Sequence, residues 1–403
     1  MISVLGILVL PLLALAFSVD RRAVAWRTVL GAFLLQASIG ALVLYFPPGK
    51  VALEAVAEFV GGVLAYSQAG ISFMFGRVAS DSFGFIFAFR VLPVIVFFSA
   101  LVSVLYHLGI MTWVIRGLGG LLQRALGTSR PESLSSAANI FVGQAEAPLV
   151  AKPFIPSMTT SELFAVMVGG LSTIAGSVMA GYAAFGVELK YLIAASFMAA
   201  PGGLMMAKLV LPETAVPKND LDELDGPDLL RSVNVFDAAA TGALSGLQIA
   251  LAVGAMLVAF IALIAMLNGV IGWAGGLFGH PELTFEAILG VLFRPLAFLL
   301  GVPWSEAGAA GSFIGQKLVV NEFVAYADFV EQQEALSAST RAIVTFALCG
   351  FANFSSIAIL LGGLGSIAPT RREDIARLGL RALGAATLAN LMSGALAGLF
   401  LGL

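Results

Sequence analysis

The sequence predicts an all-α protein that crosses a membrane several times, and two observations carry this prediction. Apolar residues make up 59% of the 403 residues and charged residues only 11%, with a mean hydropathy of +0.99. Soluble domains carry about 25% charged residues. The chain also offers several apolar runs of the roughly 20 residues that a spanning helix needs, separated by short polar joints. These features exclude a soluble protein with one membrane anchor.

The first apolar run, residues 2–19, predicts a retained span. A signal peptide would have a basic region before this run and an Ala-x-Ala-like cleavage site after it, and neither is present. Arg21, Arg22 and Arg27 follow directly, and such positive charge marks the cytoplasmic side of a membrane protein. We therefore expect the N-terminus outside and a second span over residues 28–46 that returns the chain to the outside.

The next segments alternate between apolar and amphipathic character. Residues 51–75 carry Glu54, Glu58 and Gln68, a pattern that favours a helix lying in the membrane interface, with an ordinary span as the alternative. Residues 83–108 predict a third span. Residues 110–127 are amphipathic and predict a cytoplasmic interfacial helix.

Residues 132–156 are the most unusual part of the first half. Their middle reads Gly-Gln-Ala-Glu-Ala-Pro, a turn that a lipid-facing span cannot contain, because unpaired backbone groups in hydrocarbon are costly. We predict a re-entrant hairpin whose tip reaches the middle of the membrane. Residues 160–186 then form an apolar helix broken by glycines and hydroxyls at 169–176, and residues 190–212 form the next span.

The second half repeats this order after a charged, proline-containing loop at 213–235. An amphipathic lead-in at 236–247, a span at 248–273 and an interfacial helix at 284–301 precede a second hairpin at about 305–336. The next helix is interrupted at 349–356, and residues 382–402 form the last span. Cytoplasmic arginines lie ahead of that span, at Arg371, Arg372, Arg377 and Arg381, so the C-terminus is also expected outside.

These elements predict four parts of the chain: scaffold spans (1–108), a first repeat (109–212), a cytoplasmic loop (213–235) and a second repeat (236–403). The charges around the two repeats imply opposite orientations. Inverted repeats with broken helices are typical of secondary transporters, whose sites lie near the membrane midplane between the repeats.

The hairpins and breaks supply the candidate site residues. Carboxylates inside a membrane are costly and usually functional, which singles out Glu146 and Glu322. Glu322, the amide of Asn353 and the hydroxyl of Ser356 suit the diol of a sugar, and Gln144 with Glu146 suits the edge of a nucleobase. The alternative is that these groups only satisfy one another and hold the hairpins closed. Lys152 and Lys317 are interpreted as hairpin-flank residues, snorkelling or paired with a carboxylate, outside the site.

A second group of polar residues suits a coupling ion. Asn139, with Ser172 and Thr173 in the facing broken helix, offers uncharged oxygen ligands beside freed carbonyls, as sodium prefers. The alternative is that the hydroxyls satisfy their own helix turn. One cysteine and two histidines allow no intrachain disulfide and give no zinc or haem ligand set. The net charge of −3 identifies no partner, and no nucleic-acid partner is expected.

Three segments carry a family resemblance: residues 143–149 (Gly-Gln-Ala-Glu-Ala-Pro-Leu), 321–326 (Asn-Glu-Phe-Val-Ala-Tyr) and 349–357 (Cys-Gly-Phe-Ala-Asn-Phe-Ser-Ser-Ile). In order and spacing they resemble the signatures of the concentrative nucleoside transporter family. The resemblance covers nearly the whole chain. It implies a bacterial-type member in the inner membrane, with eight spans, two opposed re-entrant hairpins and three interfacial helices, assembled as a homotrimer with one site per protomer.

The resemblance also implies roles for individual residues. Those that would surround the base of a nucleoside such as uridine or adenosine are Gly143, Gln144, Ala145, Glu146 and Val178. Those that would hold its ribose are Glu322, Phe351, Asn353 and Ser356. Those that would bind sodium are Asn139, Val142, Thr173 and Ile174, with Ser172 as a near alternative. Ala145 departs from the Thr or Ser that many members have there, which bears on base preference.

The function predicted is therefore sodium-coupled nucleoside import by alternating access, with no cofactor and no enzymatic activity. Proton coupling through Glu146 or Glu322 in the same fold is the first alternative. An intramembrane hydrolase using these carboxylates as acid and base is a weaker one, because no nucleophile motif supports it. A passive channel conflicts with two hairpins that would close the midplane.

Overall fold

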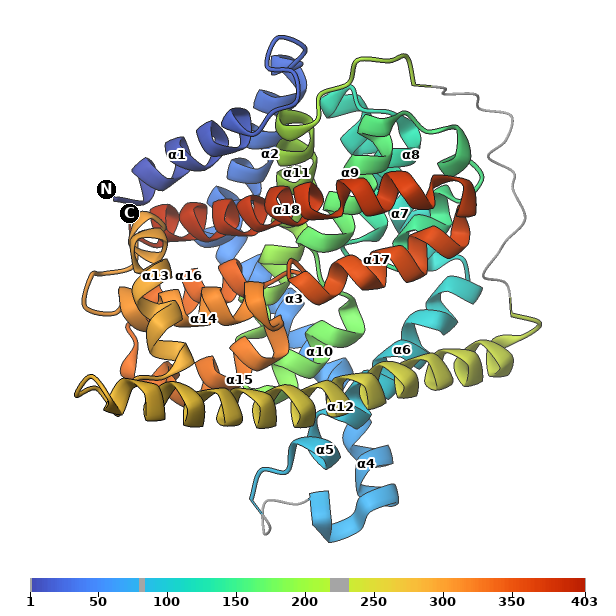
Figure 1. The fold of residues 1–403 in the computed structure, drawn as a ribbon. Coiled ribbons are helices and arrows are strands. Elements are labelled where there is room, and N and C mark those ends of the chain that lie inside the picture. Colours follow the sequence, from blue (N-terminus) through green and yellow to red (C-terminus); the bar gives the residue numbers. More distant parts are fainter. Residues whose placement is uncertain (1, 80–83, 218–231, 403) are drawn as a thin grey trace.

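The computed structural model describes residues 2–79, 84–217 and 232–402, and within these ranges it contains helices and no β-strand, which confirms the all-α prediction (Figure 1). The helices up to the predicted loop are α1 (Ile2–Ala16), α2 (Trp26–Leu44), α3 (Pro47–Ala65), α4 (Ser67–Phe75), α5 (Phe87–Arg90), α6 (Leu92–His107), α7 (Ile110–Leu126), α8 (Arg130–Ala138), α9 (Thr160–Ser172), α10 (Gly176–Phe185) and α11 (Leu189–Val210). The helices after it are α12 (Val235–Gly276), α13 (Phe285–Leu299), α14 (Ala307–Val319), α15 (Glu322–Gln332), α16 (Ala338–Leu348), α17 (Phe354–Ile367) and α18 (Arg372–Leu401). The 3-10 turns are η1 (Gly76–Ala79), η3 (Ala147–Ala151), η4 (Ile155–Ser157), η6 (Gln333–Ala335) and η7 (Pro369–Arg371).

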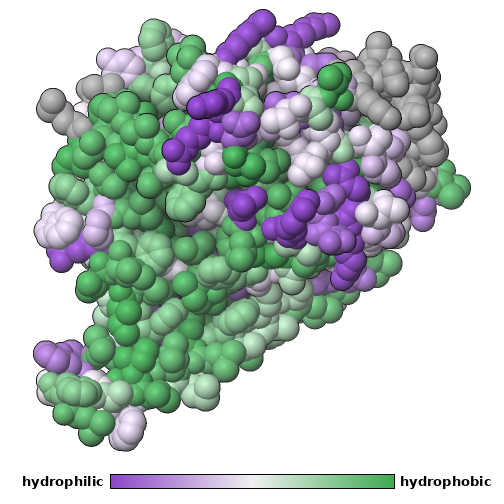
Figure 2. Space-filling view, turned by 45° about the horizontal axis from the view of Figure 1, so that its top comes forward, coloured by the Kyte–Doolittle hydropathy of each residue, from purple (hydrophilic) through white to green (hydrophobic). Residues whose placement is uncertain are grey.

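Seven helical segments of the described chain are long and apolar enough to cross a membrane. They are Trp26–Leu44, Pro47–Ala79, Phe87–His107, Thr160–Phe185, Leu189–Val210, Val235–Gly276 and Pro369–Leu401. The helix α1 is shorter than predicted, because it ends at Ala16, after which the Val19 amide donates to the carbonyl of Val210 (2.9 Å) at the end of α11. Hydrophobic residues cover a broad part of the surface in Figure 2, as a lipid-facing protein requires.

The segment that follows α2 is helical over residues 51–75, where the sequence favours an interfacial helix and leaves a span as the alternative. The Pro-Pro-Gly sequence forms the first turn of α3, where proline lacks only a donor that has no helical partner. The segment Pro47–Ala79, which has a turn at Tyr66, is long and apolar enough to cross a membrane. The interfacial helix and the ordinary span both stay predictions.

The predicted lead-in at 236–247 and span at 248–273 form a single helix, α12, of 42 residues. Asn234 caps its first turn by accepting from the Asp237 amide (2.9 Å). The helix packs along α6 at Gly242 and Gly246, where a Cβ on Gly246 would come within 2.8 Å of the Cα of Val96. It runs along one edge of the molecule in Figure 1, so α6 and α12 make one continuous outer wall.

Both predicted helix breaks are present. Residues Thr173–Ala175 separate α9 from α10, and residues Cys349–Asn353 separate α16 from α17, within the predicted ranges 169–176 and 349–356. In the second hairpin segment, α14 and α15 pack together and are joined by Val320 and Asn321 alone. The charged residues predicted to form the loop lie largely at 218–231, outside the described residues.

The buried core forms where α9, α11 and α18 pack together in the middle of the molecule. The start of α1 packs against the ends of α13 and α18, since a Cβ on Gly6 would lie 3.0 Å from the carbonyl carbon of Leu299 and 3.6 Å from the Cβ of Ala395. The two chain ends therefore lie side by side, as Figure 1 shows. Both helix breaks open into this central region.

Candidate functional site

The carboxylate of Glu322 lies at the start of α15, with only 4% of the residue exposed. Tyr182 on α10 donates its hydroxyl to Oε1 (3.1 Å), and Asn353 donates its Nδ2 to Oε2 (2.8 Å). A buried carboxylate needs such donors, because desolvation without them is costly. Three separate elements thus fix the position of Glu322, and its remaining lone pairs are available to a hydroxyl donor.

Asn353 holds this cluster to the second helix break. It is the residue that caps α17, and its Oδ1 accepts from the amide of Ser356 (2.9 Å) and the hydroxyl of Ser355 (2.7 Å). Asn353 places its side-chain oxygen where the start of α17 needs an acceptor, and its side-chain nitrogen donates to Glu322. The cap therefore orients the predicted ribose group of Glu322, Asn353 and Ser356 as one unit.

The predicted base-binding residues lie at the tip of the first hairpin segment, after α8. The carboxylate of Glu146 accepts from the Gly143 amide through Oε2 (3.1 Å), which closes the tip. A Cβ on Gly143 would lie 3.5 Å from that of Ala175 in the first break. Gln144 is buried, packs against Gly170 of α9, and its Oε1 has no hydrogen-bond partner in the described part of the chain.

A hollow of about 480 Å³ opens beside this tip, a size within the usual range for small-molecule sites. Glu146, Val142 and Ala175 line it from the tip and the first break. Hydroxyls and one carboxylate line it from the α6 and α12 wall and from the residue at position 232: Ser99, Ser103, Tyr106, Ser232, Asp237, Thr241 and Ser245. The hollow therefore places the predicted base-binding tip against the outer wall, while Glu322 is not among its lining residues.

Asn139, the first predicted sodium ligand, is fully buried at the end of α8. Neither its Oδ1 nor its Nδ2 has a hydrogen-bond partner among the described residues. An unpaired buried amide costs about 1–3 kcal/mol, so a ligand is the expected explanation. The nearby Gly169 leaves room for it, since a Cβ there would lie 3.1 Å from Asn139 Nδ2.

Three other predicted sodium ligands, Ser172, Thr173 and Ile174, lie at the first break, about one turn after Gly169. Ser172 and Thr173 both donate their hydroxyls to the carbonyl of Gly169, at 3.3 and 2.9 Å. Each hydroxyl uses its hydrogen in this bond, and its oxygen still has lone pairs that can bind a cation. Val142 and Ile174 are buried, and their backbone carbonyls are the ligands that the resemblance implies. The donor set, an amide, hydroxyls and carbonyls, fits a hard cation of low charge.

The two groups are linked where the helix breaks meet. The amide of Phe351 in the second break donates to the carbonyl of Thr173 in the first (3.2 Å). Helix α10 connects them further, because Ala175 at its start lies beside the hairpin tip and Tyr182 bonds Glu322. Seven residues of helix span about 10 Å. Val178 lies between these two positions, buried on the same helix.

Tyr182 was not predicted as a site residue. It lies four residues after Val178, on the same face of α10. This spacing, together with a tyrosine in an otherwise apolar helix, is the signal in the sequence that points to it. Its ring packs on those of Phe323 and Tyr326 (4.7 and 4.5 Å between centroids), so the hydroxyl is held towards Glu322.

The prediction for Lys317 was wrong. Lys317 is 3% exposed, and its ammonium donates to the carbonyl of Ala347 (2.9 Å) and to Oδ1 of Asn390 (2.7 Å). It does not snorkel, and it forms no salt bridge with a carboxylate among the residues that the structure describes. The carbonyl of Ala347 near the end of α16 and the side-chain amide of Asn390 on α18 hold the Lys317 ammonium in the protein interior, beside the second break.

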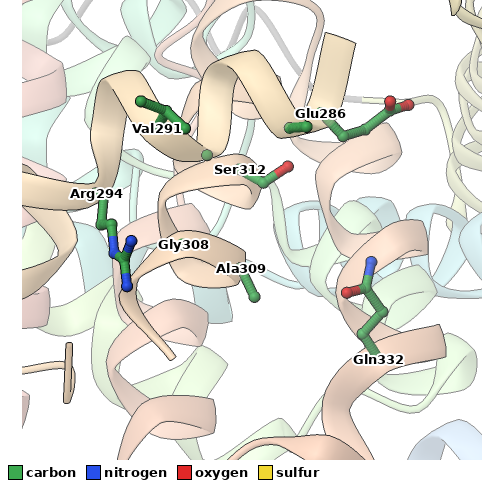
Figure 3. A pocket seen from close by; sticks show the side chains of 9 residues that line it. Glu286, Val291, Arg294, Gly308, Ala309, Ser312 and Gln332 are labelled. Carbon is green, nitrogen blue, oxygen red and sulfur yellow. The ribbon is translucent and has the colours of Figure 1, made fainter. Parts of the chain in front are cut away.

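A second hollow, of about 290 Å³, lies between α13 and α14 and contains no predicted site residue. Figure 3 shows that Glu286, Arg294 and Gln332 lie apart around it and do not converge on one point. Glu286 accepts two hydrogen bonds from Asn268 Nδ2, at 3.2 and 2.9 Å, and so is already satisfied. This hollow lacks the convergent polar groups of a small-molecule site.

Three family models match the chain and together cover most of it. They are "Na+ dependent nucleoside transporter N-terminus" over residues 5–78, "Nucleoside recognition" over residues 88–188, and "Na+ dependent nucleoside transporter C-terminus" over residues 191–398. The last of these alone matches more than half of the sequence. It includes both the second hairpin segment and the second helix break.

Characterised and uncharacterised relatives match over nearly the whole chain. An uncharacterized transporter of Haemophilus influenzae is 57% identical, covering 100% of this chain and 98% of its own length. The nucleoside permease NupC of Helicobacter pylori is 48% identical, with the same coverage. The human sodium/nucleoside cotransporter 1 is 40% identical over 99% of this chain and 63% of its own length.

Solved structures agree with these matches. The structure of CNTnw in an inward-facing substrate-bound state has a TM-score of 0.96 and 56% identity, covering 100% of this chain and 98% of that one. A CNTnw variant in an outward-facing state has a TM-score of 0.97 and 57% identity at the same coverage. The chain is a nucleoside transporter, not an enzyme, and it belongs to the concentrative nucleoside transporter family of membrane proteins.

Proposed function

We propose that the protein imports nucleosides such as uridine and adenosine by sodium symport, through alternating access at a site between the two helix breaks. This proposal rests on one observation: two different kinds of polar group lie beside the two helix breaks. On one side lies the hydrogen-bonded carboxylate of Glu322, and on the other the buried, unpaired amide of Asn139. The first suits a polar solute and the second a cation.

The nucleoside half of the site consists of two ends. The ribose is assigned to Glu322, Asn353 and Ser356, with Phe351 beside them, because a buried carboxylate held by donors accepts from a hydroxyl. The base is assigned to the tip residues, which line or adjoin the 480 Å³ hollow: Gly143, Gln144, Ala145, Glu146 and Val178. The unpaired Oε1 of Gln144 is an acceptor for the exocyclic amine of a base.

The sodium half consists of Asn139 with Val142, Thr173 and Ile174, and with Ser172 as the near alternative. The family models describe Na+-dependent transporters, which supports sodium over protons for this chain. The buried amide of Asn139 supports it independently, since an amide cannot carry a proton at neutral pH but binds sodium through oxygen. Proton coupling through Glu146 or Glu322 is the second candidate, and it would leave Asn139 unexplained.

Alternating access follows from the division of the chain into a wall and a moving part. The long α6 and α12 wall and the first spans (1–108) form the scaffold. The two hairpin segments (132–156 and 305–336) and the broken helices that follow them carry the site. CNTnw has been captured in inward- and outward-facing states, which supports the same motion here. A sodium ion entering down a membrane potential supplies about 2.3 kcal/mol per 100 mV.

The placement in the membrane is proposed on the same basis. We assign eight transmembrane helices, two re-entrant hairpins (132–156 and 305–336) and a cytoplasmic loop (213–235) in a bacterial inner membrane, with both termini outside. The adjacent chain ends in Figure 1 support their common side. A homotrimer with one site per protomer is proposed from the family resemblance.

The test is uptake of radiolabelled uridine and adenosine into liposomes that contain the purified protein. One set of liposomes has an inward sodium gradient, and a second set has an inward proton gradient without sodium. We expect saturable uptake in the first set only. It should be strongly reduced in Glu322→Gln and, at a sodium concentration that half-saturates the wild type, reduced in Asn139→Ala. Asn268→Ala is the matched control, because Asn268 bonds Glu286 and the Phe285 amide far from the site.

Three results would contradict parts of this proposal. Uptake that is driven by protons and unchanged by Asn139→Ala would show that a carboxylate, and not Asn139, binds the coupling ion. Uptake that does not saturate would indicate a channel. No uptake of either nucleoside in either gradient would overturn the assigned substrate.

A further inference from the structure

Asn390 on α18 bonds both helix breaks through one amide group. Its Nδ2 donates to the carbonyl of Ser172 at the end of α9 (2.6 Å) and to the carbonyl of Cys349 at the end of α16 (2.9 Å). An amide nitrogen has two hydrogens, fixed in one plane, so each hydrogen serves one break. The position of either carbonyl therefore constrains the position of the other.

Lys317 fixes the orientation of that amide. Its ammonium donates to Asn390 Oδ1 (2.7 Å) and to the carbonyl of Ala347 (2.9 Å), two residues before the second break begins at Cys349. A lysine cannot accept a hydrogen bond, so the oxygen of Asn390 must face it and the nitrogen must face the two carbonyls. Asn390 is 1% exposed, and water does not compete for these bonds.

The backbone of the second break is shaped to admit this side chain. A Cβ on Gly350 would lie 2.6 Å from Asn390 Nδ2 and 2.8 Å from its Cγ, closer than real side chains approach. Gly350 is therefore required beside Asn390. The next residue, Phe351, donates its amide to Thr173 (3.2 Å), so the two breaks also touch directly at this point.

The carbonyls that Asn390 and Lys317 hold are those that helix ends leave without partners. The last four carbonyls of a helix lack intrahelical donors and carry its negative partial charge. Here the ends of α9 and α16 converge, and an amide and an ammonium satisfy them. The peptides that follow Ser172 hold the sodium ligands Thr173 and Ile174, and those that follow Cys349 hold Phe351 and Asn353.

We propose that Asn390, held by Lys317, is the positioning residue that couples sodium binding to nucleoside binding. It touches neither ligand. This inference rests on the proposed sodium-coupled function, and it adds the link between the two sites. Sodium that orders residues 173 and 174 fixes the Ser172 carbonyl, the shared amide transmits this to the Cys349 carbonyl, and Asn353 then presents Glu322 in its binding geometry.

The measurement that isolates coupling is a ratio of affinities. If sodium raises the affinity for a nucleoside, the nucleoside raises the affinity for sodium by the same factor. The dissociation constant of uridine is measured in choline and in saturating sodium for the purified full-length protein. The ratio of the two constants is the coupling factor, and a residue that only supports folding does not change it selectively.

We expect a coupling factor of at least tenfold in the wild type and below threefold in Asn390→Ala and Asn390→Asp. The aspartate keeps the acceptor for Lys317 and the size of the side chain but loses both donors, so it remains informative if the alanine variant does not fold. Lys317→Met frees the amide to rotate and is expected to give an intermediate factor. Each variant is first checked for its melting temperature.

Ser393→Ala is the matched control. Ser393 is buried on the same helix, one turn from Asn390, and its hydroxyl accepts from Gln36 Nε2 (3.0 Å) on α2. Its loss removes a buried hydrogen bond that touches neither break, and the coupling factor should stay at the wild-type value. A wild-type factor in folded Asn390→Asp would overturn this inference alone. A wild-type protein whose uridine affinity ignores sodium would overturn the sodium coupling and this inference with it.

Discussion

The two helix breaks have the same backbone design and opposite chemistry. At the first break, between α9 and α10, Asn390 and Phe351 bond the carbonyls of Ser172 and Thr173. The side-chain amide of Asn139, at the nearby end of α8, has no partner in the described chain. In the second break, between α16 and α17, Lys317 and Asn390 bond the carbonyls, and Asn353 caps the next helix. The difference lies in the side chains: the first break has an unpaired amide beside it, and the second has its polar side chains paired within the chain.

This difference shows how one repeated fold acquires two roles. Broken helices expose backbone groups that must find partners inside the membrane. Where the chain supplies the partners, as an ammonium and an amide, the break becomes a fixed support for Glu322. Where a polar side chain lacks a partner, as the amide of Asn139 does in the described chain, it is available to the proposed sodium ion. The predictions below test this contrast, beginning with the largest effect.

Glu322→Gln should have the largest effect, because it removes the charge that Tyr182 and Asn353 are arranged to hold. Hydrogen bonds to charged groups contribute up to about 3 kcal/mol, and each 1.4 kcal/mol is tenfold. We expect kcat/KM for uridine uptake in proteoliposomes to fall by about a hundredfold. An unchanged KM and kcat would show that the second break does not hold the nucleoside.

Asn139→Ala should affect the first break alone. The amide is a proposed sodium ligand and has no structural partner, so its removal costs affinity for sodium and little stability. We expect the sodium concentration for half-maximal uptake to rise about tenfold, or about 1.4 kcal/mol, with the melting temperature retained. A large fall in melting temperature at unchanged sodium dependence would show that the amide is structural.

Gly350→Ala tests the filled break by steric pressure. A Cβ there would meet the amide of Asn390, and overpacking of this kind costs about 1–3 kcal/mol. We expect a lower melting temperature. Gly362→Ala is the comparison, because a Cβ at that position in α17 has nothing within 4 Å and alanine favours helix. Equal melting temperatures for the two variants would contradict the close packing around Gly350.

Tyr182→Phe should have the smallest effect. It removes one of the two hydrogen bonds to Glu322 but keeps the ring that packs on Phe323 and Tyr326. A net loss of about 1 kcal/mol is typical for one hydrogen bond, so we expect uridine affinity to fall about fivefold. Tyr326→Phe, whose hydroxyl bonds the Thr345 carbonyl (2.9 Å) and not Glu322, is its matched control for affinity.

The sequence alone was sufficient for the helical class and for both breaks, because glycines and hydroxyls inside apolar helices are rare and local. It was not sufficient for partners far apart in the chain. Lys317 and Asn390 are 73 positions apart, and Asn390 and Ser172 are 218 apart. No spacing rule connects such residues. A lysine near a predicted hairpin end also fits snorkelling, which the structure excludes.

Helix boundaries failed for a physical reason as well. The segment 236–247 has polar residues such as Asp237 and Thr241, which suggested an amphipathic lead-in distinct from the span at 248–273. The backbone hydrogen bonds of a helix form equally well on both sides of that change in polarity. Packing on α6 at Gly242 and Gly246 also keeps the helix continuous. Polarity predicts which environment a helix faces better than it predicts where the helix ends.

The continuous helix α12 has a consequence for the bilayer around the protein. Its 42 residues span about 63 Å at about 1.5 Å each. The hydrocarbon layer is only about 30 Å thick, and even a tilt of about 40° leaves the helix crossing about 48 Å. Several turns must therefore stand in the headgroup region or in water, and the polar turns around Asp237 are suited to it. Such an excess lets the surface of the hydrocarbon layer meet α12 at different turns in membranes of different thickness, while the helix stays packed on α6.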